Sequence, residues 1–315
     1  MSPPRPRFVL AAVALSALVA VLITGCGSSD SSSAASGSGG GSGEKLNVVA
    51  AENFWGSIAE QLGGDKVEVT DIITNPAADP HDYEPTSDDA KTFAGAEMAI
   101  VNGIGYDEWA SKLLAASPSD GRTELTVGDV VGLSSGDNPH QWYSPESVHK
   151  VIDQIVADFE EALPDDASYF QKQKQAFETE GLGEYNELIE AIKSEYSGTP
   201  VGASESIFEP LAPALGLKLI TPRGFMDGIS EGTEPTPQEK ATADEQLQDK
   251  QIKLWVYNSQ NTTPDVNRVT EEAEQQDIPV ATVTETMTPE GASFQEWMVR
   301  ELKALQKALG EAEGA

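Results

Sequence analysis

The sequence has little cysteine, little positive charge and no long apolar stretch. Cys26 is the single cysteine in 315 residues, so no second cysteine remains for a disulfide. Lys and Arg number 20 against 52 Asp and Glu, and the formal net charge of −32 disfavours nucleic acid and anionic lipid surfaces as partners. The apolar stretch 8–23 is shorter than the roughly 20 residues that a membrane-spanning helix needs. These shortages argue against a disulfide-bonded, nucleic-acid-binding or membrane-spanning chain.

The first 26 residues resemble a bacterial lipoprotein signal peptide. Arg5 and Arg7 precede the apolar stretch, and Ile23-Thr24-Gly25-Cys26 resembles a lipobox. We therefore expect a signal peptide over 1–26 and a lipid on Cys26, which would anchor the chain outside the cytoplasm to the bacterial cell membrane through that lipid only. The Ser- and Gly-rich stretch 27–44 cannot bury apolar surface, so it is expected to be a flexible tether.

Short apolar runs alternate with helical patterns from residue 45 onwards. Strands are predicted at 46–51, 67–73, 98–101, 200–203, 217–220, 252–257 and 279–283. Strands that alternate with helices form parallel sheets, so the fold is predicted to be α/β, with two lobes that each hold a mostly parallel sheet flanked by helices. Ligands of such sheets bind outside the carboxyl ends of the strands, which predicts a site in the cleft between the lobes.

A long helical pattern divides the two sets of strands. The predicted division is an N-terminal lobe over 45–164, a connecting helix over 165–197 and a C-terminal lobe over 198–315. Gly181 and Gly183 each cost about 1 kcal/mol relative to alanine within a helix, which allows a kink or break there. Between the later strands, 221–235 is expected to be a polar loop. Helix N-caps are expected at Asn53, Ser87, Ser144 and Thr236.

Two of the three histidines follow a proline in a similar setting. Asp79-Pro80-His81 comes just after a predicted strand, and Asn138-Pro139-His140 precedes Trp142. Proline restricts the backbone, and a stiff loop can place an imidazole before a metal ion arrives. The alternative is that both are ordinary loop histidines. His149 lies beside the apolar stripe of a predicted helix, so we expect it to be structural or exposed.

Taken together, the motifs are similar to those of one protein family. The chain resembles the solute-binding proteins of bacterial zinc and manganese ABC importers, the TroA-like metal-binding family. The residues that carry this resemblance are Asp79-Pro80-His81 with Tyr83-Glu84-Pro85, Val101-Asn102-Gly103, Asn138-Pro139-His140 with Trp142, Glu205, Glu234-Pro235-Thr236-Pro237, and Thr284-Glu285-Thr286. The resemblance implies two lobes joined by one long helix and one divalent ion between them.

The resemblance also implies a ligand set, namely His81, His140, Glu205 and Glu285. Many relatives have a histidine where this chain has Glu205, and an aspartate is common where it has Glu285. The alternative is that these two glutamates are solvated acids. Two neutral imidazoles and two carboxylates neutralise a divalent ion, and such ligands suit Zn²⁺, Mn²⁺ or Fe²⁺. The chain lacks the His-rich loop of many zinc-specific relatives, so the resemblance leaves the ion open.

The expected function is the capture of one divalent ion, zinc first and manganese second, as transported cargo. The resemblance implies delivery to an ABC import permease with its cytoplasmic ATPase, by a monomer that is not an enzyme. One alternative is a surface adhesin or interaction lipoprotein. Another is a zinc hydrolase that uses His81, His140 and Glu205, with water as the fourth ligand.

Overall fold

The structure is a computed structural model that describes residues 45–76 and 83–314. These residues belong to one compact unit, 43–315. The predicted signal peptide, Cys26, the tether and His81 lie outside the described residues. In the part of the chain that is described, no helix is both long enough and apolar enough to span a membrane.

The first sheet is parallel and has the strand order β2-β1-β3-β4. Its strands are β1 (Leu46–Glu52), β2 (Val67–Ile73), β3 (Met98–Val101) and β4 (Thr123–Thr126). Alternate residues of β1 enter different cores, because side chains point to opposite faces of a strand: Val48 and Ala50 pack in one core, Val49 and Ala51 in the other. Three of these strands were predicted from their apolar runs, whereas β4 was missed.

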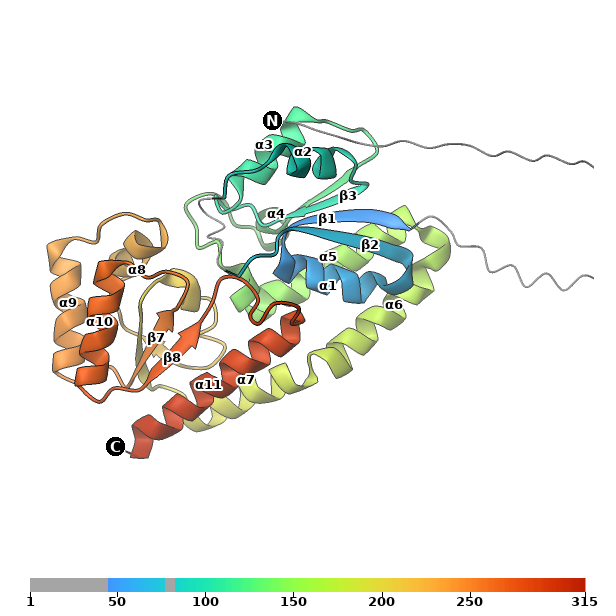
Figure 1. The fold of residues 1–315 in the computed structure, drawn as a ribbon. Helices are drawn as coiled ribbons and strands as arrows, with labels where there is room; N and C mark the ends of the chain where they lie inside the picture. Colours follow the sequence, from blue (N-terminus) through green and yellow to red (C-terminus); the bar gives the residue numbers. More distant parts are fainter. Residues whose placement is uncertain (1–44, 77–82, 315) are drawn as a thin grey trace, which may run out of the picture. The chain divides into compact units, whose positions relative to one another are not determined.

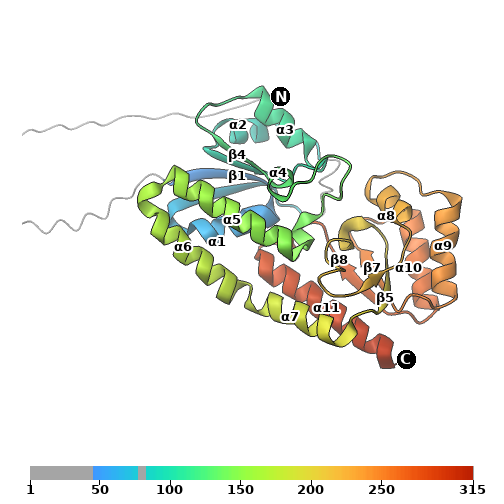
Figure 2. The ribbon, with the colours of Figure 1, turned by 180° about the vertical axis from the view of Figure 1, so that it is seen from behind.

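Helices cover both faces of this sheet. They are α1 (Asn53–Gly63), α2 (Ser87–Ala94), α3 (Glu108–Ala116), α4 (Val127–Val131), α5 (Pro145–Ala162) and α6 (Ala167–Ala176). Helices α1, α5 and α6 pack on one another, as Figure 2 shows. Trp109 of α3 and Phe93 of α2 belong to the core on the other face. Both faces of the sheet are therefore buried, as parallel sheets require.

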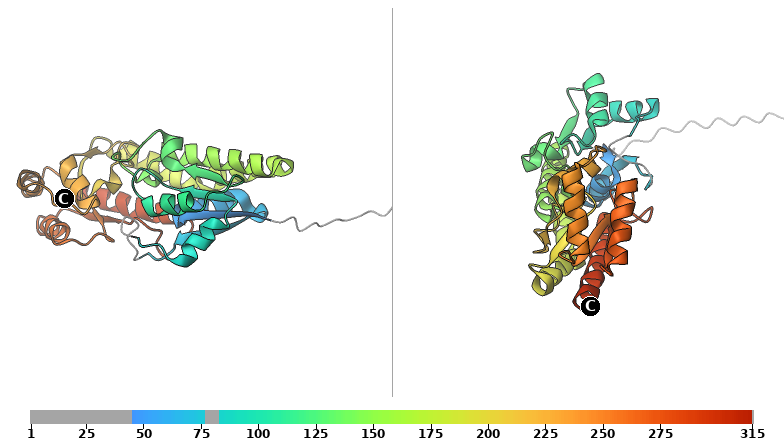
Figure 3. Two further views of the ribbon diagram at one scale, coloured as in Figure 1. Left: turned by 90° about the horizontal axis from the view of Figure 1, so that it is seen from above. Right: turned by 90° about the vertical axis from the view of Figure 1, so that its left-hand side faces the viewer.

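The second sheet repeats the topology of the first. Its strands are β5 (Pro200–Ala203), β6 (Lys218–Leu219), β7 (Leu254–Asn258) and β8 (Val280–Val283). The order is β6-β5-β7-β8, again parallel throughout. The helices of this half are α8 (Arg223–Ser230), α9 (Pro237–Gln248), α10 (Pro264–Gln275) and α11 (Phe294–Gly314). The pair α9 and α10 lies side by side (Figures 1 and 3). The predicted α/β fold with two parallel sheets is confirmed.

The expected polar loop at 221–235 was wrong, because α8 lies within it. Phe225, Met226 and Ile229 are buried at helical spacing, whereas the glycines and charged residues between them suggested a loop. Two adjacent buried residues and a third one turn later are enough to hold a helix of eight residues against the hydrophobic core.

The connecting helix continues through the glycines with a local change of form. Helix α6 passes into a π-helical turn, Phe177–Gly181, and then into α7 (Gly183–Tyr196). A Cβ at Gly181 would lie 2.9 Å from Cδ2 of Phe177, so the turn closes over that ring. Helix α7 runs along α11 (Figure 1). The sequence allowed a kink or break here, and the structure has a widened turn.

Two of the four expected N-caps are displaced by one residue. Asn53 and Ser87 are the first residues of their helices, and the cap before Ser87 is Thr86, whose hydroxyl accepts from backbone N–H groups. Ser144 and Thr236 are caps as predicted. Thr86 and Ser87 are adjacent, and the hydroxyl of either could accept from a free N–H at the start of the helix. The sequence alone therefore did not decide which of them is the cap.

Candidate metal centre

Three polar side chains meet where strands of the second sheet end. Glu205 follows β5, Asn258 is the last residue of β7, and Glu285 follows β8. Because the strands are parallel, these residues lie at the same edge of the sheet. Strands β5 and β7 are neighbours at the point where the strand order reverses, which is the usual ligand-binding position in open α/β sheets.

The Asn258 side chain joins the two glutamates. Its Nδ2 donates to Oε1 of Glu205 and, over 3.1 Å, to Oε1 of Glu285. Asn261 Nδ2 donates to Oε2 of Glu205 over 2.7 Å. Glu205 is fully buried and Glu285 is 6% exposed. The structure therefore brings two predicted ligands together and shields both from solvent, which is not the setting of ordinary solvated acids.

His140 is fully buried, and a neighbouring amide sets its tautomer. Oδ1 of Asn138 accepts from the backbone N–H of His140 over 3.0 Å and lies 2.8 Å from its Nδ1. Nδ2 of Asn138 donates to the backbone oxygen of Ser206 and to Glu209. Since a backbone N–H only donates, Oδ1 is the atom next to the ring, and Nδ1 must donate to it. The lone pair of a neutral His140 is then on Nε2, as metal ligation requires.

A strained loop after β3 brings Tyr106 to the glutamates. Gly103, Ile104 and Gly105 all have positive φ, with 60° at Ile104, which is a costly angle for a β-branched residue. The Tyr106 hydroxyl donates to Oε2 of Glu285 over 3.1 Å, and its ring centroid is 6.0 Å from that of His140. Tyr106 thus contacts two of the predicted ligands, Glu285 through its hydroxyl and His140 through its ring.

The loop that follows β3 is held by buried Asp107, and the buried side chain of Glu52 interacts with Asp107. The two carboxylate oxygens of Asp107 accept from the backbone N–H groups of Asn102 and Gly103, over 2.7 and 2.8 Å. Burial raises the pKa of Asp107 to about 6, against the lowering effect of those N–H groups. Burial, followed by the charge of Asp107, raises the pKa of Glu52 well above its usual range. The protonated form of Glu52 is therefore favoured relative to an exposed glutamate, while Asp107 holds the loop.

The chain segment before His81 is fixed by residues from the second sheet. The Gln260 side chain donates to the backbone oxygen of Pro76 and accepts from the N–H groups of Glu285 and Thr286. Thr286 Oγ1 also donates to Pro76, over 3.2 Å. Pro76 is the last described residue before 77–82, the stretch that contains His81. One glutamine thus ties the Glu285 loop to the described residue that precedes this stretch.

The His140 loop is also tied to Glu285. Tyr143, three residues after His140, donates its hydroxyl hydrogen to the backbone oxygen of Thr284 over 2.8 Å, and its oxygen lies 2.5 Å from Oε2 of Glu301 in α11. Thr284 Oγ1 and Trp297 Nε1 both donate to the other oxygen of Glu301. Burial raises the pKa of Glu301 to about 7, although these hydrogen bonds lower it. Glu301 is therefore part ionised near neutral pH.

We expect Glu301→Gln to change how stability depends on pH. The pKa of Glu301 is higher in the folded protein than its ordinary 4.5, so between about 4.5 and 7 the folded state binds more protons than the unfolded state. Stability conferred by this group must therefore fall as pH rises through that window, by up to about 3 kcal/mol. Glutamine cannot ionise, and its amide can still accept from Thr284 and donate to Tyr143.

Urea unfolding at pH 4.5 and 7.5 measures this effect. The variant should gain stability relative to the wild type as pH rises, whereas Glu311→Gln, an exposed change on the same helix, should not. Equal pH dependence in the wild type and Glu301→Gln would contradict the assignment of a raised pKa.

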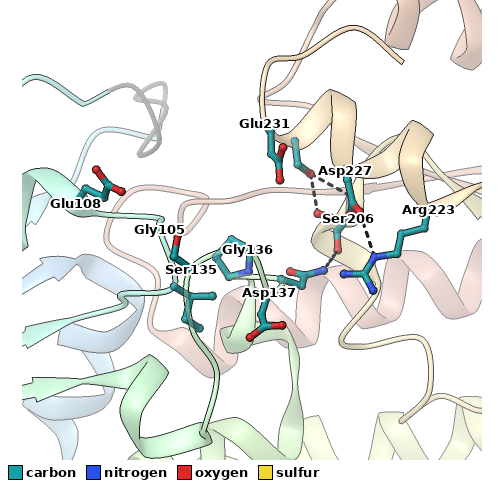
Figure 4. A pocket seen from close by; sticks show the side chains of 13 residues that line it. Gly105, Glu108, Ser135, Gly136, Asp137, Ser206, Arg223, Asp227 and Glu231 are labelled. Atoms are coloured by element: carbon teal, nitrogen blue, oxygen red, sulfur yellow. Dashed lines mark hydrogen bonds and ion pairs between the residues drawn. The ribbon is translucent and has the colours of Figure 1, made fainter. Parts of the chain in front are cut away.

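A cavity of about 280 Å³ lies beside Asn138, and four acids line it with one cation. Figure 4 shows Arg223 turned toward Asp227, with Nε to Oδ2 at 3.1 Å, and Asp137 and Glu231 at the same cavity. Neither His140 nor the two glutamates line it, so the cavity is distinct from the candidate metal centre. Its acidic lining creates a potential that favours cations near the residue that orients His140.

The described residues do not form a complete ligand group by themselves. Within 45–76 and 83–314, no three His, Cys, Asp or Glu side chains are grouped so as to hold a metal ion. Glu205 and Glu285 share Asn258, and Tyr106 lies between Glu285 and His140. His81 is outside the described part, so the four-ligand set stays a prediction. His149, with a side chain 44% exposed, lies apart near Glu178, as expected.

The sequence analysis missed the residues that orient the predicted ligands. Asn258 and Tyr106 were not singled out, and Asn138 was noted only as part of a motif. Asn258 could have been singled out because it comes directly after the predicted strand 252–257. A polar amide that continues a buried strand must be hydrogen-bonded, which points to a binding or positioning role. No pattern pointed to Tyr106, whose position depends on the strained turn.

Comparisons with known proteins find relatives of similar sequence and a structure of the same fold. A manganese-binding lipoprotein of Halalkalibacterium halodurans, MntA, is 26% identical over 211 residues, covering 64% of this chain and 67% of that protein. A manganese ABC transporter substrate-binding lipoprotein of Streptococcus mitis, PsaA, is 25% identical over 245 residues, with 70% and 75% covered. A manganese-bound periplasmic metal-binding protein of Candidatus Liberibacter asiaticus has the same fold, with a TM-score of 0.70, 21% identity, and 84% and 100% covered.

The model of one protein family matches nearly all of the described chain. That family is described as the periplasmic zinc-uptake complex component A, and the match covers residues 48–308. The match includes β1 to α11 and therefore both sheets. The resemblance inferred from the motifs is confirmed: the chain belongs to the zinc-uptake component A family of metal-binding ABC transporter components.

Proposed function

We propose that this protein captures one divalent transition-metal ion outside the cytoplasm and delivers it to an ABC import permease. The observation that carries the proposal is the buried pair Glu205 and Glu285, joined by the Asn258 amide and contacted by Tyr106, which also packs on His140. Buried carboxylates are stable when a cation or hydrogen bonds compensate their charge. An ion bound here by both glutamates and two neutral imidazoles would leave no net charge.

The ligands of the proposed site are His81, His140, Glu205 and Glu285. The His140 tautomer set by Asn138 leaves Nε2 as the coordinating atom. Four protein ligands fill a tetrahedral zinc site and leave no position for an activated water, so the proposal includes no catalysis. Nitrogen and oxygen ligands suit zinc first by the Irving–Williams order, and the carboxylates leave manganese bindable. The relatives named above bind manganese, which supports a divalent cargo of this class.

Changing Glu205 to His tests both the site and the ion. The change removes one negative charge and the freedom of a carboxylate to bind through two oxygens, and manganese prefers oxygen ligands. We expect the zinc-to-manganese affinity ratio to rise by about tenfold or more, since even changes outside the ligand shell cost about 10–100-fold in affinity. The measurement is competition calorimetry on metal-stripped wild type and Glu205→His with both ions.

Glu209→Gln is the matched control, because Glu209 contacts Asn138 but is not a proposed ligand. It should leave the ratio close to that of the wild type. An unchanged ratio in Glu205→His would mean that Glu205 is not a ligand. Genes for a membrane permease and an ATPase beside this one would support delivery.

The proposed location depends on Cys26, as the relatives named lipoproteins suggest. Cys26→Ser should release the protein from the membrane or stall its processing, because only the thiol can carry the lipid. Fractionation of cells that express wild type, Cys26→Ser and Ser29→Ala measures this, and Ser29→Ala should behave as the wild type. Membrane retention of a normally cleaved Cys26→Ser protein would disprove the anchor.

A further inference from the structure

Each oxygen of the two buried glutamates accepts a hydrogen bond from a neutral donor. Oε1 of Glu205 and Oε1 of Glu285 both accept from Asn258 Nδ2. Oε2 of Glu205 accepts from Asn261, and Oε2 of Glu285 accepts from Tyr106. Asn258 Nδ2 therefore lies next to Oε1 of both glutamates, while the two Oε2 atoms have separate donors.

The orientation of Asn258 is fixed by the backbone around it. Its Oδ1 accepts from the N–H of Gln260 over 3.0 Å, and its own N–H donates to Ser204 Oγ over 3.1 Å. Because Gln260 N–H can only donate, the amide oxygen must face it, and the NH₂ group must face the glutamates. Asn258 is fully buried and ends a central strand. The donor is thus held in one place by the sheet.

This placement restricts how an ion can bind. An ion coordinated by both Oε1 atoms would lie between them, and Nδ2 of Asn258 already occupies that position. Two-oxygen binding by either glutamate would also require its Oε1, at the expense of the hydrogen bond from Asn258. Single-oxygen binding through Oε2 keeps both of those bonds, and each Oε2 can share an ion with its own donor, Asn261 or Tyr106, because a carboxylate oxygen has two acceptor sites. Carboxylates that each provide one oxygen favour a coordination number of four, which zinc accepts more readily than manganese.

We propose that Asn258 is a specificity-determining positioning residue, which holds Oε1 of Glu205 and of Glu285 away from the ion and so limits each glutamate to one coordinating oxygen. This inference rests on the proposed function. It adds that the choice between zinc and manganese depends on an amide that does not contact the ion.

The test is Asn258→Leu, which has a similar size and no amide donor. Both Oε1 atoms become available, so the zinc-to-manganese affinity ratio should fall by about tenfold, the value of one hydrogen bond to a charged group. Competition calorimetry on metal-stripped protein measures the ratio. Visible absorption of the Co²⁺-loaded protein reports coordination number directly: the wild type should show the strong bands of four-coordinate cobalt, and the variant the weak bands of higher coordination.

Two further variants make the test decisive. Asn267→Ala removes an exposed asparagine of α10 whose side chain donates to the backbone oxygen of Thr262, and it should change neither ratio nor spectrum. Asn258→Ala also removes the amide donor to both Oε1 atoms and should lower the ratio as Asn258→Leu does. If Asn258→Leu does not fold, as a melting curve would show, Asn258→Ala decides the matter.

Two different results would contradict the inference and the proposed function, respectively. Equal weakening of both ions with an unchanged cobalt spectrum would mean that Asn258 only supports the fold, and the inference would be wrong. A wild type that binds no ion in a one-to-one ratio would instead overturn the proposed function on which the inference rests.

Discussion

Zinc at a thousandfold excess over its dissociation constant should raise the free energy of unfolding of the metal-stripped protein by about 4 kcal/mol. An ion that binds only the folded state stabilises it in this way, and the proposed ligands come from both halves of the chain. The double variant His81→Ala, His140→Ala removes two of four proposed ligands, so its melting temperature should not change with zinc or manganese. Differential scanning calorimetry with and without each ion measures the effect.

The third histidine provides a matched control. His149 has a half-exposed side chain on α5 and is not a proposed ligand, so His149→Ala should keep the full metal-dependent shift. With a formal net charge of −32, the chain could also attract ions to its surface without a specific site. Equal shifts in the wild type and the double variant would show that such surface binding accounts for the stabilisation.

Trp142→Ala should lower the free energy of unfolding by about 3–5 kcal/mol, as expected when a large aromatic side chain is removed from a core. Trp142 is fully buried, and its ring stacks on Phe54 with centroids 4.2 Å apart. It also contacts the rings of Tyr106 and His140, at 5.0 and 5.2 Å. The cavity would therefore open directly beneath a proposed ligand, and metal affinity should fall with stability.

Urea unfolding of Trp142→Ala and Trp142→Phe separates these effects. Phenylalanine keeps a ring against Phe54, so it should lose clearly less stability than alanine. A loss below about 1 kcal/mol in Trp142→Ala would contradict the packing role, because surface changes are usually of that size or smaller.

The strands could be predicted where burial made them uniformly apolar. Leu254, Trp255 and Val256 of β7 and all four residues of β3 are buried, so their apolar runs stood out from the polar sequence around them. Strand β4 has the sequence Thr-Glu-Leu-Thr, in which Leu125 is the only buried residue. Its pairing with β3 depends on backbone hydrogen bonds between distant segments, which leave no trace in a short polar stretch.

The candidate site also has residues that the sequence could predict and residues that it could not. His140, Glu205 and Glu285 were found because their residue types and neighbours match a family pattern, and family membership is now established. Their partners were not found, because Asn258 lies 53 residues from Glu205 along the chain, and Tyr106 lies 179 residues from Glu285. Such contacts arise only when the two sheets have folded and their strand ends are placed, so local patterns cannot show them.

Anomalous X-ray diffraction from crystals grown with zinc, and separately with manganese, tests the central claim most directly. The account predicts one strong anomalous peak per chain, with His81, His140, Glu205 and Glu285 as the ligands at about 2.0–2.2 Å for zinc. A peak bound by other residues, or peaks scattered over surface carboxylates with none at these four residues, would contradict it.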